Sequence, residues 1–171
     1  MQRFNLKKIT LTAIFSAFAL ISFMIEQLLP PLFLPGAKIG FANVFILLAL
    51  VLIGNKSAFI VLLLKCVLGS VFSGNVSAIM YSLPSSILAL ITEIALFRGV
   101  KSFSVISISV VGAVITSAVQ NVIFCLITGT IANLTYLPYL VLIAILAGVI
   151  VGFTLYTIIK IIPNRVLDKI T

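Results

Sequence analysis

Apolar residues run along almost the whole chain and are interrupted at five places by proline, glycine, polar or charged residues. The interruptions are Pro30-Pro31 with Pro35-Gly36, Gly54-Asn55-Lys56, Gly74-Asn75, Arg98-Gly99-Val100-Lys101, and residues 128–136. Six apolar segments remain, at residues 10–29, 39–53, 57–73, 76–97, 103–127 and 137–162. An unpaired backbone group in hydrocarbon costs several kcal/mol, and a barrel would need alternating polar strands, so each segment is expected to be a helix. The pattern predicts an all-α integral membrane protein with six transmembrane helices in one bundle, forming a single domain over residues 1–171.

Composition supports lipid as the solvent of this chain. Of the 171 residues, 63% are hydrophobic and 8% are charged, whereas a soluble domain has about a quarter of its residues charged. A mean hydropathy of +1.39 excludes a water-soluble globule. A span takes roughly 20 apolar residues, so the chain has room for several spans and little else.

The basic residues indicate the orientation of the bundle. With a cytoplasmic N-terminus, the outer loops contain only Lys38, and the inner side contains Arg3, Lys7, Lys8, Lys56, Arg98, Lys101, Lys160, Arg165 and Lys169. Because cytoplasmic loops carry an excess of Lys and Arg, both termini are expected in the cytoplasm. The net charge of +8 therefore marks membrane orientation, and no nucleic-acid partner is expected, because the cations are not gathered on one face.

The second apolar segment is too short to span a membrane. Residues 41–53 would form about 20 Å of helix against a hydrocarbon core of about 30 Å. Either the helix begins earlier, near Gly36, or residues 35–40 enter the membrane as irregular backbone, which is tolerated where it lines a cavity. In both cases this stretch would form part of a pocket. A plain extracellular loop followed by a helix start is the third interpretation.

Lys65 is expected close to the middle of the bilayer. It lies nine residues after Lys56 at the inner edge, which is about 13 to 14 Å along a helix. A central lysine costs about 2.5 to 3.5 kcal/mol on insertion scales. Gly69, one turn above, narrows the helix where a ligand or another segment could approach. Contact with a ligand and an ion pair with Glu26 are both open, and the two are compatible.

Further polar residues are expected in the outer half of the membrane. Gln120 and Asn121 lie some eight residues below the outer end of the fifth segment, and Lys38 and Asn43 lie near the start of the second. The two amides could simply bond neighbouring helices. Together with Lys65, they could instead line an outward-facing pocket for a small substrate with a carboxylate, a phosphate or several carbonyl oxygens.

Glu93 is predicted about one turn from the inner edge of the membrane. Arg98 and Lys101 follow it directly. A side chain so close to the interface can reach water or pair with those cations. We therefore expect a solvated or paired carboxylate at this position.

Small residues recur at helical spacing in two segments. Ala13 and Ala17 lie in the first segment beside Thr12 and Ser16, and Gly148 and Gly152 lie in the sixth. Such spacing lets helices approach closely. The ordinary explanation is packing within the bundle, and a docking strip for another membrane protein is the second possibility.

The sequence lacks the residues that most enzyme chemistries need. There is no histidine, and Asp168 is far from any other acidic residue, so neither a metal nor a clustered-aspartate site for a diphosphate is expected. Gly74 is followed by Asn75-Val76, so residues 69–74 are not a phosphate-binding loop. No catalytic residue and no cofactor are predicted. Cys66 and Cys125 lie in separate apolar segments and are expected to be buried without a disulfide.

Two stretches carry a resemblance to a known family. Residues 7–17, Lys-Lys-Ile-Thr-Leu-Thr-Ala-Ile-Phe-Ser-Ala, resemble the first helix of substrate-binding S components of energy-coupling factor (ECF) transporters. Glu26, followed by Pro-Gly-Ala-Lys-Ile-Gly-Phe-Ala-Asn at 35–43, is similar to the signature of the Gx transporter family, also labelled heptaprenyl diphosphate synthase component I. In that family Lys65 matches a basic residue, and Gln120 is the one residue of 116–120 that matches a polar patch.

The resemblance implies an importer component in the bacterial cytoplasmic membrane. It would capture a vitamin-, flavin- or quinone-related compound from outside and use no catalysis of its own. Its partners would be a membrane coupling subunit, docked at Ala13 and Ala17, and two cytoplasmic ATPase subunits. The residues expected at the substrate are Glu26, Gly36, Lys38, Gly40, Asn43, Lys65, Gln120 and Asn121. Two competing hypotheses are a non-catalytic membrane component of polyprenyl diphosphate synthesis and a structural membrane subunit without a ligand.

Overall fold

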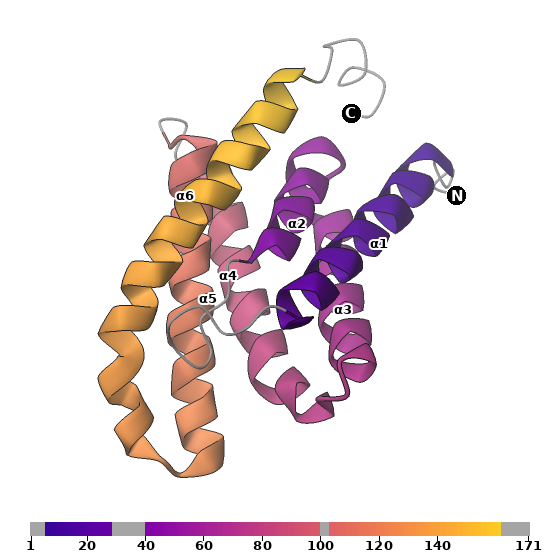
Figure 1. Cartoon of the computed structure of the whole chain (residues 1–171). Helices are drawn as coiled ribbons and strands as arrows, with labels where there is room; N and C mark the ends of the chain where they lie inside the picture. Colours follow the sequence, from indigo (N-terminus) through magenta and orange to yellow (C-terminus); the bar gives the residue numbers. More distant parts are fainter. Residues whose placement is uncertain (1–5, 29–39, 100–102, 162–171) are drawn as a thin grey trace.

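A computed structural model describes residues 6–28, 40–99 and 103–161, and over these ranges the chain is helical without any strand (Figure 1). The elements are α1 (Leu6–Leu28), α2 (Phe41–Leu52), α3 (Asn55–Phe72), the short 3-10 helix η1 (Val76–Ala78), α4 (Ile79–Gly99), α5 (Val105–Thr128), the 3-10 helix η2 (Ile131–Tyr136) and α6 (Leu137–Ile161). The predicted all-α architecture is confirmed, and the predicted helix ends lie within four residues of those observed.

Five of the six α-helices in the described ranges are long and apolar enough to cross a membrane, and α2 is the shorter exception. With 12 residues, α2 is about 18 Å long, which is too short for the hydrocarbon core. Eight of its residues are buried, and a helix that is apolar on all sides belongs inside a protein. Figure 1 shows α2 in the centre of the bundle.

The backbone at Gly40 decides where α2 begins. Gly40, the residue before the helix, has a φ of +79°, a left-handed conformation that residues with a side chain rarely adopt. A helix that continued from Gly36 through Gly40 would need a negative φ there, so the helix does not begin near Gly36. The predicted membrane entry of irregular backbone and the plain extracellular loop both concern residues 35–39, which lie outside the described residues.

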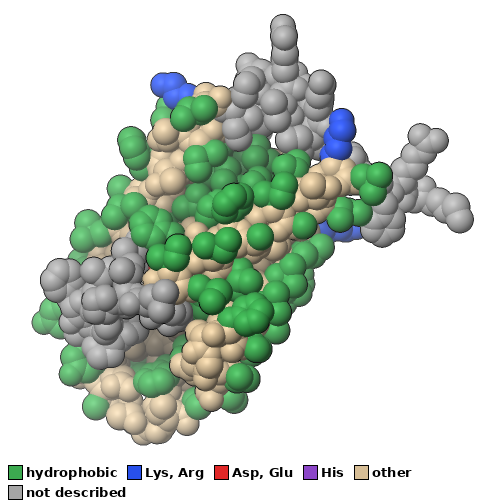
Figure 2. Space-filling view, turned by 45° about the vertical axis from the view of Figure 1, so that its right-hand side comes forward, with side chains coloured by type: hydrophobic (Ala, Val, Ile, Leu, Met, Phe, Trp, Pro, Cys, Tyr) green, Lys and Arg blue, Asp and Glu red, His purple; other side chains and the backbone are tan. Residues whose placement is uncertain are grey.

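Successive helices run in opposite directions, which brings the basic residues to one end of the bundle. Lys7 and Lys8 lie in the first turn of α1, Lys56 in the first turn of α3, Arg98 in the last turn of α4, and Lys160 in the last turn of α6. Figure 1 shows these helix ends toward the top of the molecule, and in Figure 2 the visible Lys and Arg side chains lie at the upper left and along the right edge. The arrangement agrees with the predicted clustering of cations on one side.

The outer surface of the bundle is apolar. Large hydrophobic side chains on three helices, such as Phe18 on α1, Ile91 on α4 and Phe153 on α6, are more than half exposed. Green side chains are spread over all the described parts of the face in Figure 2. Soluble monomers rarely expose contiguous apolar patches of this kind. The surface is suited to lipid, and the protein is embedded in a membrane.

Helices α5 and α6 pack with their backbones almost in contact. A Cβ atom at Gly148 would lie 2.6 Å from the Cα of Val110, and one at Gly152 would lie 2.7 Å from the Cα of Ile106. Real Cβ atoms do not approach a backbone so closely, so both glycines are required by the packing. The explanation of the Gly148 and Gly152 pair as internal packing is confirmed.

Candidate functional site

Lys65 is buried in the interior of the bundle, where its ammonium group contacts two helices. Its side chain is 8% exposed. Lys65 Nζ donates a hydrogen bond of 3.2 Å to Asn43 Oδ1 of α2, and it lies 5.7 Å from the centre of the Phe23 ring of α1. A cation at this distance from an aromatic face is attracted by the ring quadrupole. Lys65 therefore connects α3 to both α1 and α2.

The space above Gly69 is occupied by Phe23. A Cβ atom at Gly69 would lie 2.6 Å from the Phe23 ring, so a larger residue would have to push this ring aside. The sequence predicted that Gly69 lets a ligand or another segment come close to α3, and in the structure the Phe23 side chain of α1 takes this place. The same ring lies beside the Lys65 ammonium group, so Gly69 helps to set the position of the ring next to Lys65.

Glu26 joins the end of α1 to the start of α2. Its Oε1 accepts a hydrogen bond of 2.5 Å from the backbone N–H of Phe41, the first residue of α2. This carboxylate satisfies one of the N–H groups that a helix start leaves without a partner in the helix. Two residues on, Asn43 bonds Lys65. Lys65 and Glu26 thus both bond to the first turn of α2, Lys65 through Asn43 and Glu26 through the N–H of Phe41.

Gly40 completes the start of α2. Its carbonyl accepts a 2.8 Å hydrogen bond from the N–H of Asn43, which closes the first turn. A Cβ at Gly40 would lie 3.3 Å from the Asn43 amide nitrogen, and the positive φ would strain any larger residue. Gly40 therefore helps to hold Asn43 in the position from which it reaches Lys65.

The remaining predicted site residues fall into two groups. Gln120 and Asn121 are half-buried on α5, and Asn121 Oδ1 accepts a weak hydrogen bond of 3.8 Å from Cys125 Sγ. Among the described residues, no hydrogen bond joins either amide to Lys65 or Asn43. Gly36 and Lys38 lie outside the described residues. The structure thus brings together Glu26, Gly40, Asn43 and Lys65, which surround the start of α2.

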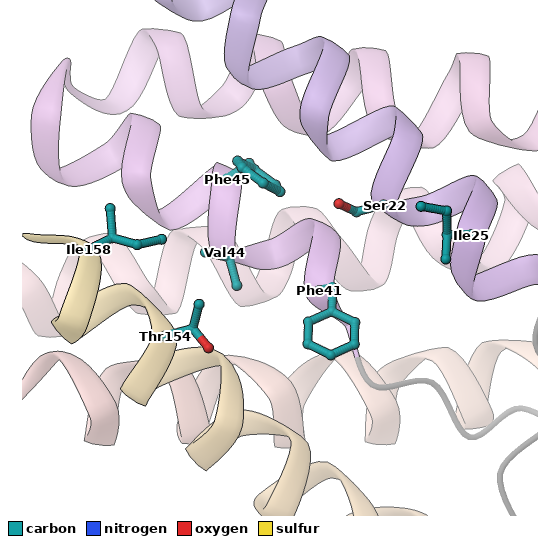
Figure 3. A pocket seen from close by; sticks show the side chains of 7 residues that line it. All are labelled: Ser22, Ile25, Phe41, Val44, Phe45, Thr154 and Ile158. Atoms are coloured by element: carbon teal, nitrogen blue, oxygen red, sulfur yellow. The ribbon is translucent and has the colours of Figure 1, made fainter.

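A cavity of about 230 Å³ lies on another side of α2, between α1 and α6 (Figure 3). Its lining is mainly apolar and consists of Ser22, Ile25, Phe41, Val44, Phe45, Thr154 and Ile158. The Thr154 hydroxyl donates to the carbonyl of Ile150, so it is satisfied within its own helix. The sequence did not reveal this cavity; the only signals are two hydroxyl residues, Ser22 and Thr154, in otherwise apolar segments.

Glu93 is buried within the bundle, contrary to the expectation that it reaches water or pairs with Arg98 and Lys101. It is 6% exposed, and Arg98 on the same helix is exposed. A Cβ at Gly112 of α5 would overlap the Glu93 carboxyl group, so the absence of a side chain there makes room for it. Sequence reasoning placed Glu93 by its depth alone and could not know which face of α4 is buried.

The small residues of α1 are divided between two surfaces. Thr12 and Ser16 are buried, and their hydroxyls donate to carbonyls one turn earlier, at Lys8 and Thr12. Ala13 and Ala17 are exposed. The two alanines consequently do not serve packing within the described part of the bundle, and they leave a low strip on the outer face of α1.

These features define a small, helical, membrane-embedded protein whose interior holds a lysine–asparagine pair near the start of α2. No group of three or more His, Cys, Asp or Glu residues that could hold a metal occurs within the described ranges. The family model for heptaprenyl diphosphate synthase component I matches residues 15–158, and the chain belongs to this family. No curated protein and no solved structure shows significant similarity to the chain.

Proposed function

We propose that this protein is the substrate-binding S component of an ECF-type importer in a bacterial cytoplasmic membrane. It captures a small anionic or oxygen-rich micronutrient, related to a vitamin, a flavin or a quinone, from the outer side. Import is driven by two ATPase subunits that act through a membrane coupling subunit. The observation that carries this proposal is the buried Lys65 with its hydrogen bond to Asn43.

The donor count of Lys65 supports ligand binding. An ammonium group has three N–H donors, and in the described part of the chain one of them is used, by Asn43. Burying a charge without full compensation is costly, and an ionisable residue inside a membrane protein is by default a functional one. A carboxylate, phosphate or carbonyl group of a ligand would use the remaining donors in a charge-assisted hydrogen bond.

The cavity beside α2 supports a ligand with an apolar body. Phe41 lines this cavity, and its backbone N–H is held by Glu26, so the cavity and the polar groups share the start of α2. Binding pockets are mostly apolar with a few polar groups that fix orientation. An amphipathic compound fits this combination better than a purely ionic one.

The exposed strip on α1 supports association with a coupling subunit. Ala13 and Ala17 are one turn apart and both exposed. Small residues at this spacing let a second membrane helix approach closely. Replacing Ala17 by a large residue is expected to abolish copurification with a coupling subunit while the protein still binds its ligand.

Mass spectrometry of the purified protein tests the substrate proposal. We expect a vitamin-, flavin- or quinone-related compound to copurify with the wild type and to be absent from Lys65→Met at equal yield. Lys65→Arg, which keeps the charge, serves as the matched control and is expected to retain part of the ligand. An isoprenoid diphosphate in the preparation would instead support the role that the family name describes. A protein without any bound compound, whose melting does not change over a ligand panel, would show a structural subunit.

A further inference from the structure

The cavity between α1, α2 and α6 is lined without any charged side chain. Five of its lining residues are apolar, and the other two, Ser22 and Thr154, carry hydroxyl groups. Burying a charge without a partner is costly. The part of a ligand that fits this cavity is therefore neutral.

The Ser22 hydroxyl is the polar group that the cavity offers to a ligand. The other hydroxyl residues of α1, which are Thr10, Thr12 and Ser16, donate to carbonyls one turn earlier in the helix. Ser22 makes no such bond, and among the described residues its hydroxyl has no hydrogen-bond partner. Figure 3 shows the Ser22 oxygen pointing from α1 toward the Phe45 ring of α2. A hydrogen-bonding atom of a ligand in the cavity would supply the missing partner.

The cavity opens to the apolar outer surface of the bundle. Two of its lining residues, Ile25 and Phe41, are 54% and 39% exposed. The surface around them is suited to lipid, so a molecule dissolved in the bilayer can enter the cavity there. A neutral molecule dissolves in hydrocarbon far more readily than an ion does, which agrees with the uncharged lining.

We propose that the ligand contains a neutral ring system with one hydrogen-bonding atom, that this part occupies the α1–α2–α6 cavity, and that Ser22 selects it. An apolar cavity of about 150 Å³ binds benzene, so a volume of about 230 Å³ suits roughly two fused rings. The inference rests on the proposed function, because it assigns the neutral part of the ligand whose anionic or oxygen-rich part meets Lys65. Phe41 and Val44 line the cavity and Asn43 bonds Lys65, so a ligand that used both would lie against the first turn of α2.

A bromonaphthol probe tests this assignment, because bromine quenches tryptophan fluorescence and the chain contains no tryptophan. Phe41→Trp places a single reporter beside the cavity. Phe153→Trp, on the exposed face of α6, places one where it senses the probe dissolved in lipid. With full-length protein in nanodiscs, we expect saturable quenching for Phe41→Trp and quenching proportional to the added probe for Phe153→Trp. Proportional quenching of both reporters would overturn the proposal.

Ser22→Ala tests the hydrogen bond to the ligand. Combined with Phe41→Trp, this substitution should weaken bromonaphthol binding about fivefold, which corresponds to the loss of one hydrogen bond between neutral groups. Bromonaphthalene has the same rings but lacks the hydroxyl group, so its affinity should stay unchanged. An equal effect on the two probes, or no effect on either, would overturn the role of Ser22.

Thr154→Phe separates a failure of this inference from a failure of the proposed function. The larger side chain would fill the cavity from α6, whereas Lys65 and Asn43 lie on α3 and α2. We expect the compound that copurifies with the wild type to be lost at equal yield, and Ser22→Leu fills the cavity from α1 should Thr154→Phe fail to fold. A compound that depends on Lys65 but is retained by the filled cavity would overturn this inference alone. Saturable, Ser22-dependent probe binding without any copurified compound would overturn the proposed function alone.

Discussion

Two regions of this protein are held together in different ways. Helices α5 and α6 meet through Gly148 and Gly152, which bring backbone against backbone. Helices α1, α2 and α3 meet through side chains, with Lys65 bonded to Asn43, Phe23 over Gly69, and Glu26 on the first N–H of α2. Close backbone packing fixes how α5 and α6 sit against each other, whereas polar and aromatic contacts fix the positions of α1, α2 and α3. If the rigid α5–α6 pair supplies stability, the polar groups of α1, α2 and α3 are available to bind a ligand.

The largest expected effect is a loss of stability in the α5–α6 region. Gly148→Leu would place a side chain against the Val110 backbone, which cannot move away as a side chain could. Overpacking of this kind costs about 3 kcal/mol, and we expect a clearly lower melting temperature in detergent, followed by circular dichroism. Gly99→Ala is the matched control, because nothing lies within 4 Å of a Cβ there. Equal melting of both variants would contradict the backbone contact.

A smaller effect is expected where a side chain, rather than backbone, meets a glycine. Gly69→Ala would push the Phe23 ring, which can give way at a cost of about 1 to 2 kcal/mol. The double variant Gly69→Ala with Phe23→Leu should recover part of the melting temperature. No recovery would show that the Phe23 ring is not what Gly69 accommodates.

Affinity changes more than stability when the polar contact of the second region is removed. Asn43→Leu deletes the acceptor of the Lys65 hydrogen bond and leaves the ammonium less well oriented. Loss of one hydrogen bond to a charged group corresponds to about 1.5 kcal/mol, or roughly tenfold in affinity. Binding of the copurified compound, measured by isothermal titration calorimetry, checks this value. An affinity within about twofold of the wild type would remove Asn43 from the site.

The smallest effect on stability is expected on the exposed strip of α1. Ala17→Leu adds a side chain on a lipid-facing surface and should change the stability by less than about 0.5 kcal/mol. Ala19→Leu, on the same helix but fully buried, makes the same substitution in the core and should lower the melting temperature markedly. Similar melting of the two variants would show that Ala17 is not exposed.

Helix positions and the membrane class are readable in the sequence, because hydrophobic length and glycine or proline breaks are properties of neighbouring residues. The same information indicated that the segment at 41–53 is too short to span, although six spans were still expected. Depth along a helix was also readable, and it predicts Lys65 near the middle of the bilayer, whereas the burial of Lys65 within the protein depends on the rotation of α3. These features depend only on local chain geometry and on the cost of exposing polar groups to hydrocarbon.

Contacts between helices were decided by the tertiary structure. Depth did not show that Glu93 faces Gly112 instead of water, or that Lys65 bonds Asn43 while Glu26 binds the start of α2. Lys65 and Asn43 are 22 residues apart, and their meeting depends on how each helix is rotated about its axis and how far it slides against its neighbour. In a chain that is apolar on nearly every helix face, hydrophobicity cannot fix that rotation, so close packing at glycines and a few polar contacts determine it.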